Sequence, residues 1–239
     1  MRPVNRGPTP TDESGNKMKF KTYQDARGKL IERLGETCSY CEMHLDSGLA
    51  VEHVRPKKPD DVADIITERE LDWYNFLLAC PNCNSTKSNK DVVPDDYFWP
   101  DRDNTFRAFN YSEGGIIKAS DALSAELKDK ADATIELTGL DKCPLNDPKA
   151  SDRRWINRRE TWDIAIRAEG RLSGKKDDSD GFRRQIVDTM TSGGYWSIWM
   201  TVFQDDSDML QRFIKALPGT ADDCFDCDGV PIQRRCGQV

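Results

Sequence analysis

The residues best suited to chemistry begin with two cysteine pairs. Cys38 and Cys41 form one Cys-x-x-Cys pair, and Cys80 and Cys83 form a second after 38 intervening residues. Each pair places two sulfurs on one tight turn, and thiolates are ligands that zinc binds well. We therefore predict a zinc ion held by four cysteines, with four unrelated buried thiols or a substitution by His44 as alternatives. Four protein sulfurs leave no open position for substrate, so this zinc would be structural.

A second group of reactive side chains lies between and just after these pairs. His53 is one of only two histidines and stands next to Glu52. If this stretch is a strand, the two side chains point to opposite sides, so His53 is free to act as a general base with an unperturbed pKa of about 6.5. A carboxylate such as Glu52 and an amide oxygen such as that of Asn84 suit Mg²⁺ or Mn²⁺. A surface or capping histidine is the alternative.

Cations near this group are candidate contacts to phosphate. Arg55, Lys57 and Lys58 follow His53 directly, and Lys87 lies about one helical turn after Asn84. Lysine and arginine near a metal site can position phosphates without reading bases. Solvated surface charges are the alternative for each.

The order of these residues resembles the HNH, or ββα-metal, nuclease family, in the form framed by two cysteine pairs. The resemblance covers about residues 38–90 and implies a metal-dependent endonuclease that hydrolyses phosphodiester bonds. It implies that His53 is the base, that Glu52 and Asn84 hold the divalent metal, and that Asn75 tethers a loop and orients the histidine. Many members carry Asp or His where this chain has Glu52, whose longer arm can change the metal geometry.

A narrower resemblance extends over more of the chain. The stretches CSYCE, EHVRPKK and LDWYNFLLACPNCNSTK, followed by LNDP and an arginine-rich helix, are similar to the PtuB-like HNH nuclease subunits of Septu-type and retron-associated anti-phage defence systems. In that group the nuclease acts beside an ABC-like ATPase. The resemblance therefore implies an ATPase partner, with double-stranded DNA as the expected substrate.

Charge does not favour binding of nucleic acid over a broad surface. The chain of 239 residues has a formal net charge of −7, and residues 38–90 hold six basic and nine acidic side chains. Nucleic-acid-binding domains are usually basic. Positive charge gathers instead at 17–33 and in the four arginines of 153–159, and a solvated helix face is the alternative for the latter.

The fold expected from these patterns is α+β: a small zinc-stapled ββα-metal core with a mostly α-helical C-terminal lobe. Apolar residues at helical spacing predict helices over 20–34, 120–140, 151–172, 180–191 and 195–217. We expect a strand near 49–54. The expected domains are a flexible N-terminal tail over 1–16, an HNH nuclease domain with its lead helix over 17–95, an irregular aromatic connection over 96–119 and a helical lobe over 120–239.

Composition also indicates where the protein works. No apolar run approaches the roughly 20 residues that span a bilayer. We therefore expect a cytoplasmic protein with no membrane partner, in which the eight cysteines stay reduced unless they bind metal.

The remaining cysteines allow a second zinc site. Cys224 and Cys227 form a third Cys-x-x-Cys pair, and Cys143 and Cys236 complete a possible set of four. Spare thiols in an acidic tail are the alternative.

Two other functions are compatible with the same residues. A non-catalytic zinc-ribbon module that binds nucleic acid or protein needs only the cysteine frame, while an HNH nuclease that acts on RNA needs the same chemistry with a different substrate.

Overall fold

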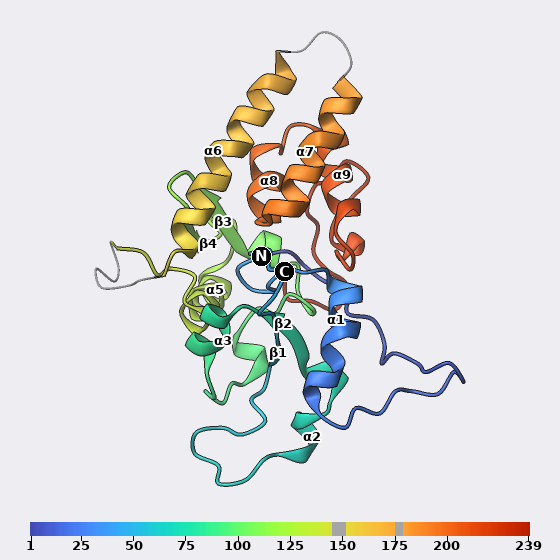
Figure 1. Cartoon of the computed structure of the whole chain (residues 1–239). Helices are drawn as coiled ribbons and strands as arrows, with labels where there is room; N and C mark the ends of the chain where they lie inside the picture. Colours follow the sequence, from blue (N-terminus) through green and yellow to red (C-terminus); the bar gives the residue numbers. More distant parts are fainter. Residues whose placement is uncertain (145–151, 175–178) are drawn as a thin grey trace.

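The protein is a mixed assembly of helices and two small antiparallel sheets (Figure 1). The computed structural model describes residues 1–144, 152–174 and 179–239. The strands are β1 (Ala50–His53), β2 (Phe76–Ala79), β3 (Phe109–Ser112) and β4 (Ile116–Ala119). The helices of four or more residues are α1 (Arg27–Leu34), α2 (Thr67–Glu70), α3 (Pro81–Lys87), α4 (Thr105–Ala108), α5 (Ala125–Thr138), α6 (Arg154–Ser173), α7 (Ser179–Gly193), α8 (Trp196–Val202) and α9 (Ser207–Ala216), together with the 3₁₀ turn η1 (Tyr23–Ala26). The α+β class is confirmed.

The hairpin β1–β2 and helix α3 form the unit that carries the candidate site. The strands pair antiparallel, with Glu52 opposite Leu77 and His53 opposite Phe76. All four residues of β2 are buried, as its continuous apolar sequence requires. Helix α3 follows at once because Pro81 fits the first helical position, where no backbone N–H is needed.

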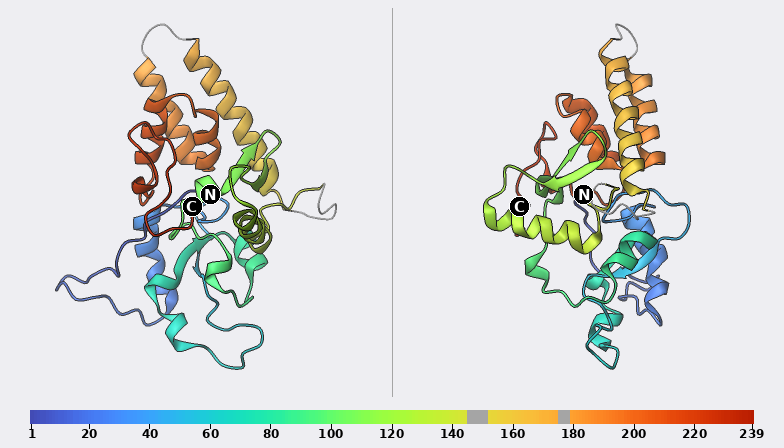
Figure 2. Two further views of the ribbon diagram at one scale, coloured as in Figure 1. Left: turned by 180° about the vertical axis from the view of Figure 1, so that it is seen from behind. Right: turned by 90° about the vertical axis from the view of Figure 1, so that its left-hand side faces the viewer.

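Helices α5 to α9 make up most of the C-terminal half. Figure 2 shows α6 and α7 extending together beyond the rest of the molecule. Buried apolar side chains such as Val51, Trp99 and Phe213 nevertheless belong to one continuous core. The division of the chain at residues 95 and 119 therefore stays a prediction.

Residues 1–6 differ from the flexible tail expected over 1–16, because they are anchored to the rest of the molecule. Met1 and Val4 are fully buried, and the Met1 amine donates a hydrogen bond to Ser197 Oγ at 3.0 Å. Arg6 is also buried and donates to the carbonyl of Phe76 on β2. This segment is anchored by individual side chains and backbone bonds rather than by an apolar period, so a periodicity argument does not detect it.

Several expected helices have different limits. The helix expected over 195–217 is two helices, because the Asp206 side chain caps the N-terminus of α9 by accepting a hydrogen bond from Met209 N at 3.1 Å. The helix expected from residue 120 begins at Ala125, with Ser124 as its cap. The helices expected over 20–34, 151–172 and 180–191 correspond to η1–α1, α6 and α7. Residue 151 and the LNDP stretch lie outside the described residues.

The segment 96–119, named above as an irregular aromatic connection, contains α4 and the hairpin β3–β4. Across the described parts of the chain, no helix is both long enough and apolar enough to cross a membrane.

Candidate active site and metal centre

The first two cysteine pairs meet in a buried cluster. The sulfurs of Cys38, Cys41, Cys80 and Cys83 all lie within 4.8 Å of one another, and Cys41 Sγ is 3.6 Å from Cys80 Sγ. A tetrahedral zinc ion with Zn–S bonds of about 2.3 Å requires sulfurs about 3.8 Å apart. The cluster therefore fits the predicted structural zinc ion.

Each Cys-x-x-Cys pair lies on a tight turn, here called a knuckle, and both knuckles are attached to the β1–β2 hairpin. The backbone N–H of Ser39 donates to Leu78 O of β2 at 2.8 Å, which ties the first knuckle to the second strand. The second knuckle is continuous with the strand, because Cys80 follows Ala79 and caps α3. Folding of the hairpin and assembly of the metal centre thus depend on the same contacts.

A buried arginine from the C-terminal half completes this centre. Arg154 donates from Nη1 to Cys83 Sγ at 2.9 Å and from Nη2 to Gly139 O at 2.7 Å, and it pairs with Asp152 at 2.6 Å. Four thiolates around one Zn²⁺ carry a net charge of −2, which a guanidinium partly offsets. Helix α6 is therefore fastened directly to the metal centre.

The arginines of 153–159 do not form one solvated helix face, because two of the four are buried. Arg154 and Arg158 are each only 2% exposed, and Arg158 donates to the carbonyls of Gly115 and Leu140 at 2.7 and 2.8 Å. Only Arg153 and Arg159 of the four are exposed. Charge counted along the sequence does not distinguish a solvated arginine from one that binds buried carbonyls.

The second set of cysteines is not gathered in the same way. Cys143 and Cys224 are buried, whereas Cys227 and Cys236 are exposed. Among the described residues, only the first four cysteines form a cluster of three or more His, Cys, Asp or Glu side chains able to hold a metal. The possible second zinc site therefore gains no support, and His44 lies outside the cluster, with Nε2 3.0 Å from Asp46.

His53 lies at the end of β1 with its ring fixed on two sides. The ring centroid is 4.9 Å from that of Tyr23 and 5.2 Å from that of Phe76, and Nε2 is 3.0 Å from Glu70 O. A carbonyl oxygen only accepts, so Nε2 carries the hydrogen and Nδ1 holds the lone pair in the neutral ring. Burial lowers the pKa of His53 below its usual value near 6.5, which favours the neutral ring at pH 7.

Asn75 ties together the segments around His53. Its Oδ1 accepts from Arg55 N at 2.8 Å, and its Nδ2 donates to Arg55 O at 2.8 Å and Arg69 O at 2.9 Å. Arg55 stands just after β1, and Arg69 immediately precedes Glu70, whose carbonyl holds His53. One amide thus connects the strand end to the backbone that orients the histidine.

Glu52 is already paired with a cation of the protein. Lys87 Nζ lies 2.8 Å from Glu52 Oε1 and donates to the carbonyl of His53 at 2.7 Å. Burial raises the pKa of Glu52, an effect that Lys87 opposes. Lys87 has 0% exposure, so the structure differs from the expected phosphate contact: this lysine, the last residue of α3, faces β1 instead of solvent.

The remaining predicted cations are more accessible. Arg55 and Lys58 are exposed. Lys57 is half-buried, lies 4.2 Å above the ring of Tyr23 and is paired with Glu70 at 3.1 Å. Arg55 and Lys58 thus remain candidates for phosphate contact, while Lys57 also supports the wall beside His53.

The two candidate ligands of the catalytic metal differ in their surroundings. Asn84 is partly exposed on α3 and borders a small hollow, whereas Glu52 is buried against Lys87. Carboxylate and amide oxygens are hard donors of the kind that Mg²⁺ and Mn²⁺ prefer. The donor chemistry fits a divalent cation, provided that the ion displaces the Lys87 ammonium from Glu52.

Two residues of this site were not predicted from the sequence. Tyr23 lies outside the cysteine frame, and Glu70 takes part through its backbone carbonyl. A backbone acceptor leaves no signature in residue type, and an aromatic residue before a helix is ordinarily a core residue.

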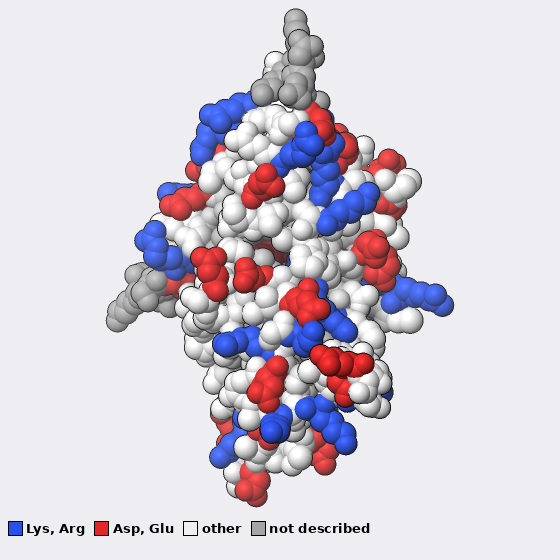
Figure 3. Space-filling model, turned by 45° about the vertical axis from the view of Figure 1, so that its right-hand side comes forward, with Lys and Arg blue, Asp and Glu red and all other residues white. Residues whose placement is uncertain are grey.

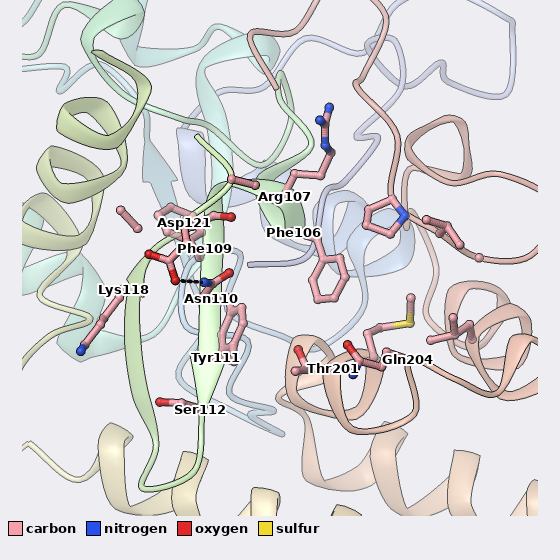
Figure 4. A pocket seen from close by; sticks show the side chains of 18 of the residues that line it. Phe106, Arg107, Phe109, Asn110, Tyr111, Ser112, Lys118, Asp121, Thr201 and Gln204 are labelled. Atoms are coloured by element: carbon pink, nitrogen blue, oxygen red, sulfur yellow. Dashed lines mark hydrogen bonds between the residues drawn. The ribbon is translucent and has the colours of Figure 1, made fainter. Parts of the chain in front are cut away.

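A separate hollow of about 690 Å³ lies between the β3–β4 hairpin and the end of α8 (Figure 4). Phe106, Tyr111, Thr201 and Gln204 line it, and Asn110 donates to Asp121 at 3.2 Å beside it. None of the candidate catalytic residues borders this hollow.

Two antiparallel strands and a helix form a ββα unit. Four cysteines frame this unit, and His53 is fixed at the end of its first strand. Residues 38–90, less than a quarter of the chain, match the family model for HNH endonuclease. This part of the protein is therefore similar to HNH endonucleases, in agreement with the broader resemblance. A comparison with curated proteins gave no significant match.

Proposed function

We propose that the protein is a metal-dependent HNH endonuclease that hydrolyses phosphodiester bonds in DNA. The observation that carries the proposal is the state of His53 within the matched domain. Its Nε2 is held by Glu70 O, which leaves Nδ1 as the basic atom, and burial favours the neutral ring. A general base needs both properties.

Each residue then has a definite task in the reaction. His53 Nδ1 accepts a proton from the attacking water, while Asn75 and the Glu70 carbonyl keep the ring in place. Glu52 and Asn84 would hold a divalent cation, which when bound stabilises charge on the phosphoryl and leaving oxygens. The cysteine centre holds the hairpin and takes no part in the chemistry, because its four sulfurs leave no open position.

The test is cleavage of supercoiled plasmid by the full-length, zinc-loaded protein with Mg²⁺ or Mn²⁺, compared with a structured RNA under the same conditions. We expect nicked or linear DNA only when a divalent metal is added. If the RNA is cut and the DNA stays intact, the substrate of the same reaction is RNA rather than DNA. Failure to cut either polymer, alone or with an ABC-type ATPase, would overturn the nuclease proposal.

A second function has one specific observation in its favour. The buried pair between Glu52 and Lys87 fills the position of the expected cation with an ammonium of the protein. A non-catalytic zinc module that binds nucleic acid would retain such a pair permanently. Binding of DNA without cleavage, together with one zinc and no second metal per chain in calorimetry, would support this alternative.

We also propose that the nuclease serves in a bacterial anti-phage defence system beside an ABC-like ATPase, in the cytoplasm. The narrower resemblance to PtuB-like subunits supports this role. Figure 3 shows basic and acidic side chains interspersed on one face rather than a single basic field. With a net charge of −7, a partner that presents the DNA would raise the activity. Co-purification with the ATPase and cleavage that depends on it would be the expected result.

A further inference from the structure

A small hollow of about 230 Å³ opens beside the candidate active site and includes residues outside the matched domain. Asn84, a candidate metal ligand, borders it from α3. Tyr23 borders it from η1, and the same ring packs against His53 at 4.9 Å. The hollow is lined by Tyr23, Gln24, Arg27, Gly48, Leu49, Ala50, Val51 and Asn84.

The charge at this hollow is positive and comes from one residue. Arg27 is the only charged side chain that lines it, and it is exposed. The nearby carboxylate of Asp25 is engaged elsewhere, because it accepts from the backbone N–H groups of Lys21 and Thr22 at 3.1 and 2.9 Å. Among the described residues, neither Asp25 nor Glu32 is paired with Arg27.

Arg27 also differs from the other cations of α1. Lys29 is paired with Glu32 at 2.7 Å, and Arg33 donates to the carbonyl of Arg6 at 2.8 Å. In the described parts of the chain, the guanidinium of Arg27 has no hydrogen bond or ion pair. A guanidinium offers a planar set of donors that matches two oxygens of one phosphate.

The opposite wall leaves room for a polymer backbone. Gly48 has φ +84°, and nothing lies within 4 Å of the position that a Cβ would take. Ala50 and Val51 belong to β1, which within the described residues pairs only with β2. Small side chains at a strand edge allow a sugar-phosphate chain to approach closely.

We propose that this hollow receives a nucleic-acid phosphate next to the scissile one and that Arg27 binds it. The segment 23–34 is then the second wall of the substrate groove, supplied from outside residues 38–90. Arg27 binds substrate, while Tyr23 acts through His53 as a positioning residue. This inference rests on the proposed nuclease function.

The test compares Arg27→Gln with Lys29→Gln in the full-length, zinc-loaded protein. Glutamine has a helix propensity close to that of both residues, and Arg27 is exposed while Lys29 is partly exposed, so neither change should disturb α1. We expect Arg27→Gln to raise the KM for duplex DNA on the order of tenfold while kcat stays within about twofold. Arg27→Lys should recover part of the loss, and Lys29→Gln should match the wild type.

Binding measured without added divalent metal gives an independent readout. The slope of log Kd against log salt concentration should fall by about 0.9 in Arg27→Gln, the amount lost with one phosphate contact. An Arg27→Gln protein whose KM and salt slope both equal those of Lys29→Gln would overturn the inference. If the wild type binds DNA but never cuts it, the nuclease proposal fails while the salt slope still decides the role of Arg27.

Discussion

The cysteine centre and the His53 centre lie on the same hairpin but are completed in different ways. At the cysteine centre, four sulfurs converge within 4.8 Å, a spacing that suits one zinc ion. At the His53 centre, Glu52 is paired with Lys87, and His53 and Asn75 are hydrogen-bonded to backbone. We therefore expect the scaffold to depend on a metal, whereas contacts within the protein already arrange the reactive residues.

Removing one zinc ligand should have the largest effect. A Cys80→Ser protein should lose its zinc and cooperative folding of the hairpin, because binding of structural zinc contributes on the order of 10 kcal/mol to folding in small domains. Zinc content by mass spectrometry and thermal unfolding measure this directly.

The matched control comes from the cysteines that do not converge. Cys227 is exposed and lies outside the cluster. Cys227→Ser should keep one zinc per chain and the wild-type Tm, whereas a loss of zinc in this variant would contradict the single-centre assignment.

Breaking the ion pair at the second centre should cost less. Lys87→Met leaves the buried carboxylate of Glu52 without its cation, and breaking a buried pair typically destabilises by about 3–5 kcal/mol. The free energy of unfolding in denaturant is measured for this variant and for Lys90→Met, which removes an exposed lysine. The difference between the two isolates the effect of burial.

The same variant tests where the divalent metal binds. If Mn²⁺ takes the place of the Lys87 ammonium, adding it should restore part of the Tm of Lys87→Met. The gain should vanish in Lys87→Met with Glu52→Gln. Equal gains in both proteins would exclude Glu52 as the ligand responsible.

Loss of the Asn75 amide should have the smallest effect on stability. Asn75→Ala removes three hydrogen bonds around Arg55 and Arg69, which we expect to cost about 2 kcal/mol. Because the backbone beside Glu70 loosens, kcat should fall by roughly tenfold or more with less change in KM. Asn89→Ala, at an exposed asparagine, is the control; equal kcat in both variants would contradict the positioning role of Asn75.

Local features of both centres could be predicted from the sequence. Cysteine spacing was sufficient to predict the cluster, because a Cys-x-x-Cys turn directs both sulfurs to one point whatever surrounds it. The strand at Glu52 and His53 was likewise expected and is present as β1. In both cases the spacing of neighbouring residues alone determines the local geometry.

Long-range contacts of charged residues were not predictable in this way. Lys87 and Arg154 were counted as surface cations, yet both are buried, one on Glu52 and one on Cys83. The docking of Met1 onto Ser197 joins positions 196 residues apart. Tertiary packing determines such contacts, and neither residue type nor sequence spacing predicts them.

The proposed reaction depends most directly on His53, and the other histidine provides a matched control. The decisive measurement is the single-turnover rate of plasmid cleavage with Mn²⁺ by zinc-loaded His53→Ala and His44→Ala proteins. We expect a loss of roughly 10²–10⁴-fold in His53→Ala, the usual contribution of a general base, and the wild-type rate in His44→Ala. An undiminished rate in His53→Ala with its zinc in place would contradict the proposed reaction.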